Sequence, residues 1–330
     1  MIISKMSFAS AAAIMNKRGM RRILVLGSLN IDLVQRVPRI PAPGETLKGG
    51  DLEIFSGGKG ANQACAAARL GADVYMAGKV GRDAFGERLR RELAATGVHT
   101  ERVGESGRAT GSGTIFVLPD GENMIVIASG ANADISPQFA REVITDLRPG
   151  DLLLCQLEIP LEAVQAAVTA AHALGVVTML DPAPGYPLPD DLLRAIDILT
   201  PNQTETAILL ARTESPENFA EAELAARELQ GRGANTVIVK MGALGCLLAQ
   251  GVAATARPGF LVQAVDTTAA GDTFNGALAA SLARDGTLLA ATQFANAAAA
   301  LSVTKPGAIA SIPSLDDVEE FLGIKVAMRS

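Results

Sequence analysis

Long hydrophobic runs, histidines and cysteines are scarce in this 330-residue sequence, and each shortage excludes a class of protein. Apolar residues make up 48% of the chain, yet no uninterrupted apolar run reaches the roughly 18 residues that suggest a membrane-spanning helix. The 2 histidines, His99 and His172, stand apart from each other and from any cluster of metal ligands. Catalysis is therefore expected to depend on carboxylates.

Cysteine usage and charge narrow the choice of partners. The 3 cysteines, Cys65, Cys155 and Cys246, are odd in number, far apart and set in apolar or Ala/Gly-rich stretches. This pattern is typical of buried thiols in a reducing cytoplasm and disfavours a structural zinc site. The net charge is -6, with lysine and arginine scattered along the chain, which argues against nucleic acid. We expect a cytoplasmic protein that binds small molecules, with no nucleic-acid or membrane partner.

The region after residue 21 predicts an α/β fold. The run from Ile23 to Leu26, closed by Gly27, has the form of a buried parallel strand. Further strands are expected near Val74–Ala77, Leu152–Gln156, Val176–Leu180, Ile196–Leu199 and Val237–Lys240. Ala-rich helices separate most of these runs, so the sequence predicts a doubly wound, mainly parallel sheet with helices on both faces, over residues 22–323.

Both chain ends are expected to lie outside that domain. Residues 1–21 carry Lys5, Lys17 and Arg18 but no acidic residue, which superficially matches a targeting peptide. Several methionines in this stretch offer other translation starts just before the first strand, so we predict a disordered extension instead. Residues 324–330 are expected to form a short tail.

Two stretches break the alternation of strands and helices. Residues 32–56 are rich in proline and glycine, and residues 109–129 place Asp120-Gly121 between two alternating segments, which predicts a hairpin. A few antiparallel strands from these stretches would form a small β-lid over a ligand at the carboxyl edge of the sheet. The apolar face of the lid would be exposed in a monomer, so we expect a homodimer through lid pairing.

The most informative stretch is residues 265–276 (VDTTAAGDTFNG), where small residues lead directly into an apolar helical pattern. Such a loop exposes N–H groups at a helix N-terminus, and they can hold the charge that builds on a transferring phosphoryl group. Asp272 could accept the proton of an attacking hydroxyl. Capping of the helix by Asp272 is an equally good account of this fragment alone.

A second glycine-rich segment, residues 56–62 (SGGKGAN), opens an Ala-rich helix. Its lysine is followed by glycine rather than Ser or Thr, which disfavours a P-loop, and no G-x-G-x-x-G follows the first strand. The glycines let the backbone approach a polar ligand, and Asn62 offers a donor and an acceptor. Asn30 and Asp32, just past the first strand, suit sugar hydroxyls. A glycine-rich turn with a capped loop is the alternative.

A third segment, residues 200–205 (TPNQTE), follows a strand. Asn202 and Glu205 are three residues apart on the expected first turn of a helix and would share one face. This oxygen pair could orient water around Mg²⁺. Helix capping by Asn202 explains the fragment equally well.

Together and in this order, the segments resemble the ribokinase-like (PfkB) family of carbohydrate kinases. The likeness spans about residues 22–323, and its most specific pieces are GGKGANQA at 57–64 and DTTAAGDTFNG at 266–276, the second matching the family's C-terminal signature. Two signatures at the proper separation support each other. The resemblance implies a kinase that transfers the γ-phosphate of ATP to the 5-hydroxyl of D-ribose, giving ribose 5-phosphate and ADP.

The resemblance also implies roles for individual residues. Asp272 is the catalytic base, and Ala269, Ala270 and Gly271 form the anion hole with it. Sugar-binding positions are Asn30, Asp32, Gly58, Lys59, Gly60, Ala61, Asn62 and Glu158, with Asp272. Nucleotide positions are Asn202, Lys240, Met241, Gly242, Ala243, Leu244, Gly245, Gly271, Asp272 and Asn296. Mg²⁺ is tied indirectly to Asn202 and Glu205, and activating K⁺ to Asp266, Thr268, Ser302, Lys305, Gly307 and Ser311.

A few positions depart from the family pattern and leave alternatives open. Asn296 stands where many members have His, Thr268 where an aliphatic residue is common, and Asp181 where Asn is usual. Deoxyribose, a ketohexose derivative, inosine or adenosine is the alternative substrate, although the polar sugar positions favour a free pentose over a nucleoside. A sugar-binding regulator without activity is the rival of another class, and the intact Asp272 argues against it.

Overall fold

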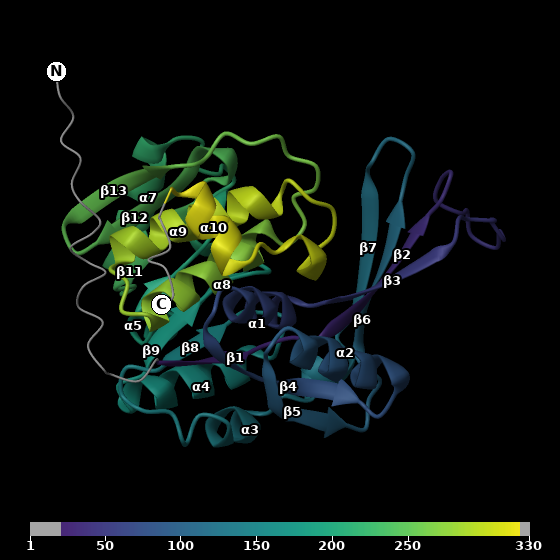
Figure 1. The fold of residues 1–330 in the computed structure, drawn as a ribbon, viewed down its shortest axis with the longest axis horizontal. Helices are drawn as coiled ribbons and strands as arrows, with labels where there is room; N and C mark the ends of the chain where they lie inside the picture. Colours follow the sequence, from purple (N-terminus) through teal and green to yellow (C-terminus); the bar gives the residue numbers. More distant parts are fainter. Residues whose placement is uncertain (1–20, 324–330) are drawn as a thin grey trace, which may run out of the picture.

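The computed structural model describes residues 21–323 and contains a nine-stranded central sheet between two layers of helices (Figure 1). From one edge to the other, its strands are β13 (Ala253–Pro258), β12 (Gly245–Gln250), β11 (Thr236–Lys240), β10 (Ile198–Leu199), β9 (Val177–Leu180), β8 (Leu152–Cys155), β1 (Arg22–Leu26), β4 (Asp73–Gly81) and β5 (His99–Ser106). All pairs from β11 to β5 are parallel, and β12 and β13 are antiparallel. The predicted doubly wound sheet is confirmed. Apart from Arg21, the predicted N-terminal extension lies outside the described residues, as does the predicted tail.

The central strands are mostly apolar because helices cover both of their faces. In β1, Ile23 and Val25 belong to one buried cluster, and Leu24 and Leu26 belong to the cluster on the opposite face. Every strand predicted from an apolar run is present. Strands β5 and β13 were not predicted, because they lie at the sheet edges and their residues are mostly half-buried or exposed. Strand β12 was not predicted either, although all its residues except Gln250 are buried.

The helices form two layers. One face of the sheet is covered by α1 (Lys59–Arg69), α2 (Ala84–Ala95), α8 (Ala270–Ala283), α9 (Leu288–Ser302) and α10 (Leu315–Phe321). The other face is covered by α3 (Pro137–Glu142), α4 (Leu161–Ala173), α5 (Asp190–Arg194), α6 (Gln203–Leu209) and α7 (Phe219–Gly231). In Figure 1, α8, α9 and α10 lie above β1, and α3 and α4 lie below it. Among residues 21–323, no helix combines the length and the apolar character needed to cross a bilayer.

A second, four-stranded sheet projects from one end of the molecule, at the right of Figure 1, and is the predicted lid. Its order is β3 (Leu52–Gly57), β2 (Asn30–Arg36), β6 (Gly111–Val117) and β7 (Asn123–Ala128). The β6–β7 hairpin is present, and Gly121, with φ 88°, donates its N–H to Leu118 O at 3.0 Å in the turn. The two outer pairs are antiparallel, but β2 and β6 are parallel, so the sheet is mixed where antiparallel strands were expected.

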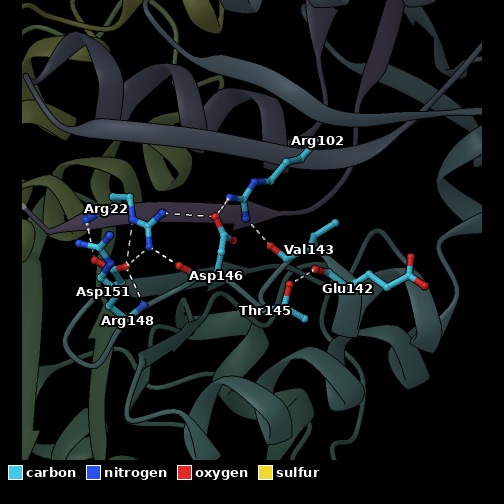
Figure 2. A network of polar contacts seen from close by, with 8 residues as sticks. All are labelled: Arg22, Arg102, Glu142, Val143, Thr145, Asp146, Arg148 and Asp151. Atoms are coloured by element: carbon cyan, nitrogen blue, oxygen red, sulfur yellow. Dashed lines mark hydrogen bonds and ion pairs between the residues drawn. The ribbon is translucent and has the colours of Figure 1, made fainter.

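A network of charged side chains ties together the amino ends of the central strands (Figure 2). Arg22, at the start of β1, donates from Nε and Nη2 to Oδ2 of Asp151 at 3.1 and 2.9 Å. Asp146 accepts from Arg22 at 3.4 Å and from Arg102 of β5 at 2.6 Å. The network lies at the end of β1 opposite to the carboxyl edge, which leaves that other edge for a ligand.

Candidate active site

The candidate site is a cleft at the carboxyl edge of the sheet, where the loops after β9, β10 and β11 meet the N-termini of α1, α6 and α8. Its volume is about 400 Å³. The cleft is lined by Lys59, Asp181, Ala183, Asn202, Gln203, Thr204, Glu205, Lys240, Gly242, Thr267, Ala269, Ala270, Gly271 and Asp272. Three segments that are far apart in the sequence, and were singled out separately, therefore meet in one place.

Asp272 lies in the first turn of α8, and its carboxylate is held by two side-chain amides. Asn62 Nδ2 donates to Oδ2 at 3.0 Å, and Gln63 Nε2 donates to Oδ1 at 2.9 Å. Asp272 does not cap the helix, because the N-cap residue is Ala269, with no side-chain cap hydrogen bond. The capping alternative is therefore wrong. Burial raises the pKa of Asp272; the ammonium of Lys59 opposes this rise, and Asp181 adds to it.

The backbone before Asp272, where the anion hole is predicted, presents free N–H groups to the cleft. Ala269 adopts a left-handed conformation (φ 57°, ψ 16°), which turns the chain into α8. Within the described part of the chain, the N–H groups of Gly271 and Asp272 have no acceptor, as is usual for the first turn of a helix. Together with the dipole of a 14-residue helix, these donors favour a negative charge.

Close helix packing fixes Asp272 against its partners. At Gly276, one turn further along α8, an added Cβ would lie 2.5 Å from Ala66 Cβ and 2.6 Å from Gln63 O. Helix α8 therefore contacts the backbone of α1, the helix that carries Asn62 and Gln63. Glycine at position 276 allows both amides to reach the same carboxylate.

The predicted sugar positions are connected to Asp272 through Asn62 and Lys59, and of these positions only Lys59 lines the cleft. Glu158 Oε2 accepts from Ser28 Oγ at 2.5 Å and from the Lys59 N–H at 3.0 Å. Gly58, with φ 89°, brings its backbone so close that a Cβ would lie 2.8 Å from Asn30 N. Burial, followed by the charge of Glu158, raises the pKa of Asp32 to about 6.

One acceptor in this group has no partner among residues 21–323. Asn62 Oδ1 is buried and accepts no hydrogen bond from them, although Nδ2 of the same amide is bonded to Asp272. A buried polar atom without a partner carries a free-energy cost, which a ligand hydroxyl would relieve. The site is therefore arranged to accept a hydrogen-bond donor next to Asp272.

Lys59 lies between these two groups and is half-buried. Burial lowers its pKa, but the carboxylates of Asp272, Asp181, Glu158 and Glu205 outweigh this effect, and the net pKa is above that of an ordinary lysine. Its ammonium is therefore charged in the cleft at neutral pH. It partly neutralises the carboxylates that a phosphorylated ligand would meet.

Only some of the predicted nucleotide-binding residues line the cleft. Asn202, Lys240, Gly242, Gly271 and Asp272 line it. Met241 is buried, whereas Ala243 and Leu244, in a 3₁₀ turn over Gly242–Leu244, are exposed. Asn296, on α9, donates from Nδ2 to Arg257 O at 3.1 Å and is not among the lining residues.

Asn202 and Glu205 form a capping box at the start of α6. Asn202 Oδ1 accepts from the Glu205 N–H at 2.8 Å, and Glu205 Oε2 accepts from the Asn202 N–H at 2.7 Å. The capping interpretation is confirmed, yet both residues also line the cleft. Residues 21–323 contain no group of three or more His, Cys, Asp or Glu side chains that could hold a metal. The pair thus fits contact with Mg²⁺ through water.

The positions assigned to K⁺ come together directly before α8. Asp266 Oδ1 accepts from Thr268 N at 2.9 Å, and Oδ2 accepts from Gly307 N at 2.8 Å. The Asp266 N–H donates to Val303 O, so residues 265–268 lie beside residues 302–311. Burial opposes the charge of Asp266, but the bonds from Thr268 and Gly307 lower its pKa. These contacts bring Asp266, Thr268 and Gly307 together, and the Asp266 carboxylate supplies the negative charge that a monovalent cation needs.

Several residues of the site were not predicted from the sequence. Asp181, Ala183, Gln203, Thr204 and Thr267 line the cleft. Gln63 bridges Asp272 and Asp181, Gln156 donates from Nε2 to Gln63 Oε1 at 2.7 Å, and Asn132 donates from Nδ2 to Asn30 Oδ1 at 2.7 Å. Ser28 donates to Glu158. Gln63 directly follows Asn62, and Ser28 and Gln156 each lie two residues before a predicted sugar position.

Comparison with known proteins agrees with this geometry. Residues 20–315 match the model of the pfkB family carbohydrate kinases. A ribokinase of Haemophilus influenzae is 44% identical over 305 residues, covering 92% of this chain and 99% of that protein. A deoxyribokinase of Salmonella typhi is 38% identical over 306 residues, with coverages of 92% and 99%. The structure of Arabidopsis thaliana ribokinase complexed with ribose and ATP matches with a TM-score of 0.84 at 33% identity, covering 92% of this chain and 98% of that one.

Proposed function

Because this chain belongs to the pfkB family of carbohydrate kinases, we propose that it is a ribokinase, which transfers the γ-phosphate of ATP to the 5-hydroxyl of D-ribose. The observation that carries the proposal is the position of Asp272, a buried carboxylate between the unpartnered N–H groups of an anion hole and a cluster of polar sugar positions. The likeness to ribokinases over most of the chain supports the choice of ribose.

In the proposed reaction, the 5-hydroxyl oxygen attacks the γ-phosphorus in line with the bond to the ADP oxygen. The O–P bond to ribose forms as the bond to ADP breaks, and the hydroxyl proton passes to the carboxylate of Asp272. The raised pKa of Asp272 makes it a stronger base than an ordinary aspartate. The N–H groups of Gly271 and Asp272 stabilise the charge on the transferring phosphoryl group.

The sugar site supplies acceptors for several hydroxyl groups. Asp32 and Glu158 offer carboxylate oxygens, and the unpartnered Asn62 Oδ1 offers a buried amide oxygen. These acceptors suit a free sugar that carries several hydroxyl groups.

Deoxyribose is the second candidate substrate, because a deoxyribokinase is almost as similar to this chain as the ribokinases are. It differs from ribose by a single hydroxyl. A site whose buried acceptors pair with that hydroxyl rejects the sugar that lacks it, since the acceptor is then left without a partner. The likeness to several ribokinases, up to 44% identical, favours ribose.

Two metal ions complete the proposal. When bound, Mg²⁺ would neutralise charge on the ATP phosphates, and Asn202 and Glu205 would orient its waters. K⁺ would be held by Asp266 and neighbouring carbonyls, where it would stiffen the loop that leads to Asp272. Buried free cysteines are consistent with a cytoplasmic location.

A substrate panel tests the proposal. ADP release would be measured with MgATP and K⁺ on ribose, deoxyribose, fructose, inosine and adenosine, and the product would be examined by ³¹P NMR for a phosphate on carbon 5. We expect the highest kcat/KM with ribose. A higher value with another sugar would replace the substrate but keep the mechanism, whereas ribose binding without turnover on any sugar would favour the regulator.

A further inference from the structure

A buried ion pair between a lysine and an aspartate lies in the cleft. Lys240, the last residue of β11, donates from Nζ to Oδ1 of Asp181, just after β9, at 2.7 Å. The two side chains are only 12% and 2% exposed. Removing two charges from water costs desolvation free energy, so a buried ion pair contributes little to the net stability of the fold. A functional role explains its presence better.

The ammonium of Lys240 faces the anion hole. A Cβ on Gly271 would lie 3.6 Å from Lys240 Nζ, and Gly271 carries one of the unpartnered N–H groups. Hydrogen bonds from an N–H to an oxygen span about 2.9 Å, so one phosphate group can reach both donors. Gly271 directly precedes Asp272, which places such a phosphate beside the proposed base.

Asp181 is itself held in place from three sides. Its Oδ2 accepts from Gln63 Nε2 at 2.8 Å, and its backbone N–H donates to Cys155 O at 2.9 Å. The Gln63 amide that binds Asp181 also binds Asp272, and Gln156 fixes its carbonyl end. Through this arrangement, the position of the Lys240 ammonium is set relative to that of Asp272.

We propose that Lys240, held by Asp181, contacts the γ-phosphate of ATP in the anion hole and lets the site discriminate triphosphate from diphosphate. Lys240 then binds the transferring group, and Asp181 is a positioning residue. The inference rests on the proposed kinase function and deepens it.

The test compares two nucleotides that differ in the γ-phosphate. Binding of MgADP and of a Mg-loaded β,γ-imido analogue of ATP would be measured by calorimetry for the wild type and for the double variant Lys240→Met with Asp181→Asn. The double variant removes both charges, so no unpaired carboxylate is left to repel phosphate. Arg82→Met, which removes a cation that is 78% exposed, serves as the control.

We expect the double variant to bind the imido analogue about tenfold more weakly, the size of one charge-assisted hydrogen bond, and ADP within about twofold of the wild type. Its kcat should fall by at least about tenfold while the KM for ribose stays within about twofold, a split that a merely structural change would not produce. Equal losses for the two nucleotides, or no loss for the analogue, would overturn the proposal. Because the binding ratio needs no sugar, it stays informative even if the wild type fails to phosphorylate ribose.

Discussion

At the scale of single residues, the site depends on two aspartates in different surroundings. Asp272 is bonded to two amides and lies beside Lys59, whereas Asp32 lies against Glu158 and has no cation within the described contacts. Burial raises the pKa of both groups. The proposal gives them different tasks, since one accepts a proton during the reaction and the other binds hydroxyl groups in the ground state.

Asp32 predicts a pH dependence of sugar binding. Its pKa of about 6 is above that of an ordinary aspartate, so the carboxylate is charged at pH 8 and becomes protonated as the pH falls through about 6. A protonated carboxyl accepts fewer hydrogen bonds. We therefore expect the Kd for ribose, measured by calorimetry, to rise as the pH is lowered from 8 through about 6. Asp32→Asn should bind ribose weakly, with a Kd that stays nearly constant between about pH 5 and pH 8. Parallel profiles for the two proteins would contradict the assignment.

A site residue could be predicted when it belonged to a local motif, and was missed when its partners lie far away along the sequence. Asp272 and Asn62 were found because each belongs to a local motif with small neighbours. Gln156 and Asn132 were missed because their bonds join positions 93 and 102 residues apart, and neither residue belongs to a local motif. Lys240 was expected only as part of a nucleotide loop, since its partner Asp181 is identified by the folded chain alone.

At the scale of elements, the contact between α1 and α8 determines the geometry of the base. Gly276→Ala would place a methyl group 2.5 Å from Ala66 Cβ and force the helices apart. We expect a loss of about 1–3 kcal/mol in unfolding free energy, as is usual for overpacking. The kcat should also fall, because the Asp272 carboxylate moves away from Asn62 and Gln63. Urea unfolding and steady-state kinetics would measure the two effects.

The matched control is a glycine in another helix. Gly231 ends α7, and a Cβ there would meet nothing within 4 Å. Gly231→Ala should leave kcat unchanged and alter the unfolding free energy by less than about 1 kcal/mol, with the methyl group favouring the helix. If both substitutions had the same effect, close packing at Gly276 would not be its cause.

Most strands buried on both faces of the main sheet were predictable from the sequence, and the strands at its two edges were not. A strand covered on both faces, such as Leu152–Cys155, is continuously apolar, whereas an edge strand such as His99–Ser106 is mixed and resembles a loop. The parallel pairing of β2 with β6 could not be predicted either. These strands are far apart in the chain, and their direction is decided by where the main sheet places their ends.

At the scale of the whole molecule, the lid leaves apolar side chains open to water. Strand β7 carries Met124, Ile125, Val126 and Ile127, which are 50%, 53%, 66% and 58% exposed. An exposed edge strand of this kind tends to pair with another chain. We propose that a second copy of the chain covers it, which would give a homodimer through the lid.

Light scattering during size-exclusion chromatography would test the dimer. The 34.0 kDa chain should elute at about twice that mass at micromolar concentration. Lysine at both Val126 and Ile127 places a charge on each face of β7 and should give a monomer. The control places lysine at Val252 and Leu261, which are fully exposed outside the lid, and should still elute as a dimer. A monomeric wild type would refute the proposal.

Asp272 is proposed to remove the proton from the sugar hydroxyl. The turnover of Asp272→Asn with ribose and MgATP tests this role directly. Asparagine keeps the size of the side chain but cannot accept the proton, so we expect kcat to fall by roughly 10²- to 10⁴-fold. Ribose binding by calorimetry should change little. Asp285→Asn, at an exposed aspartate just beyond the other end of α8, should retain full turnover. An Asp272→Asn variant with kcat within a few fold of the wild type would contradict the account.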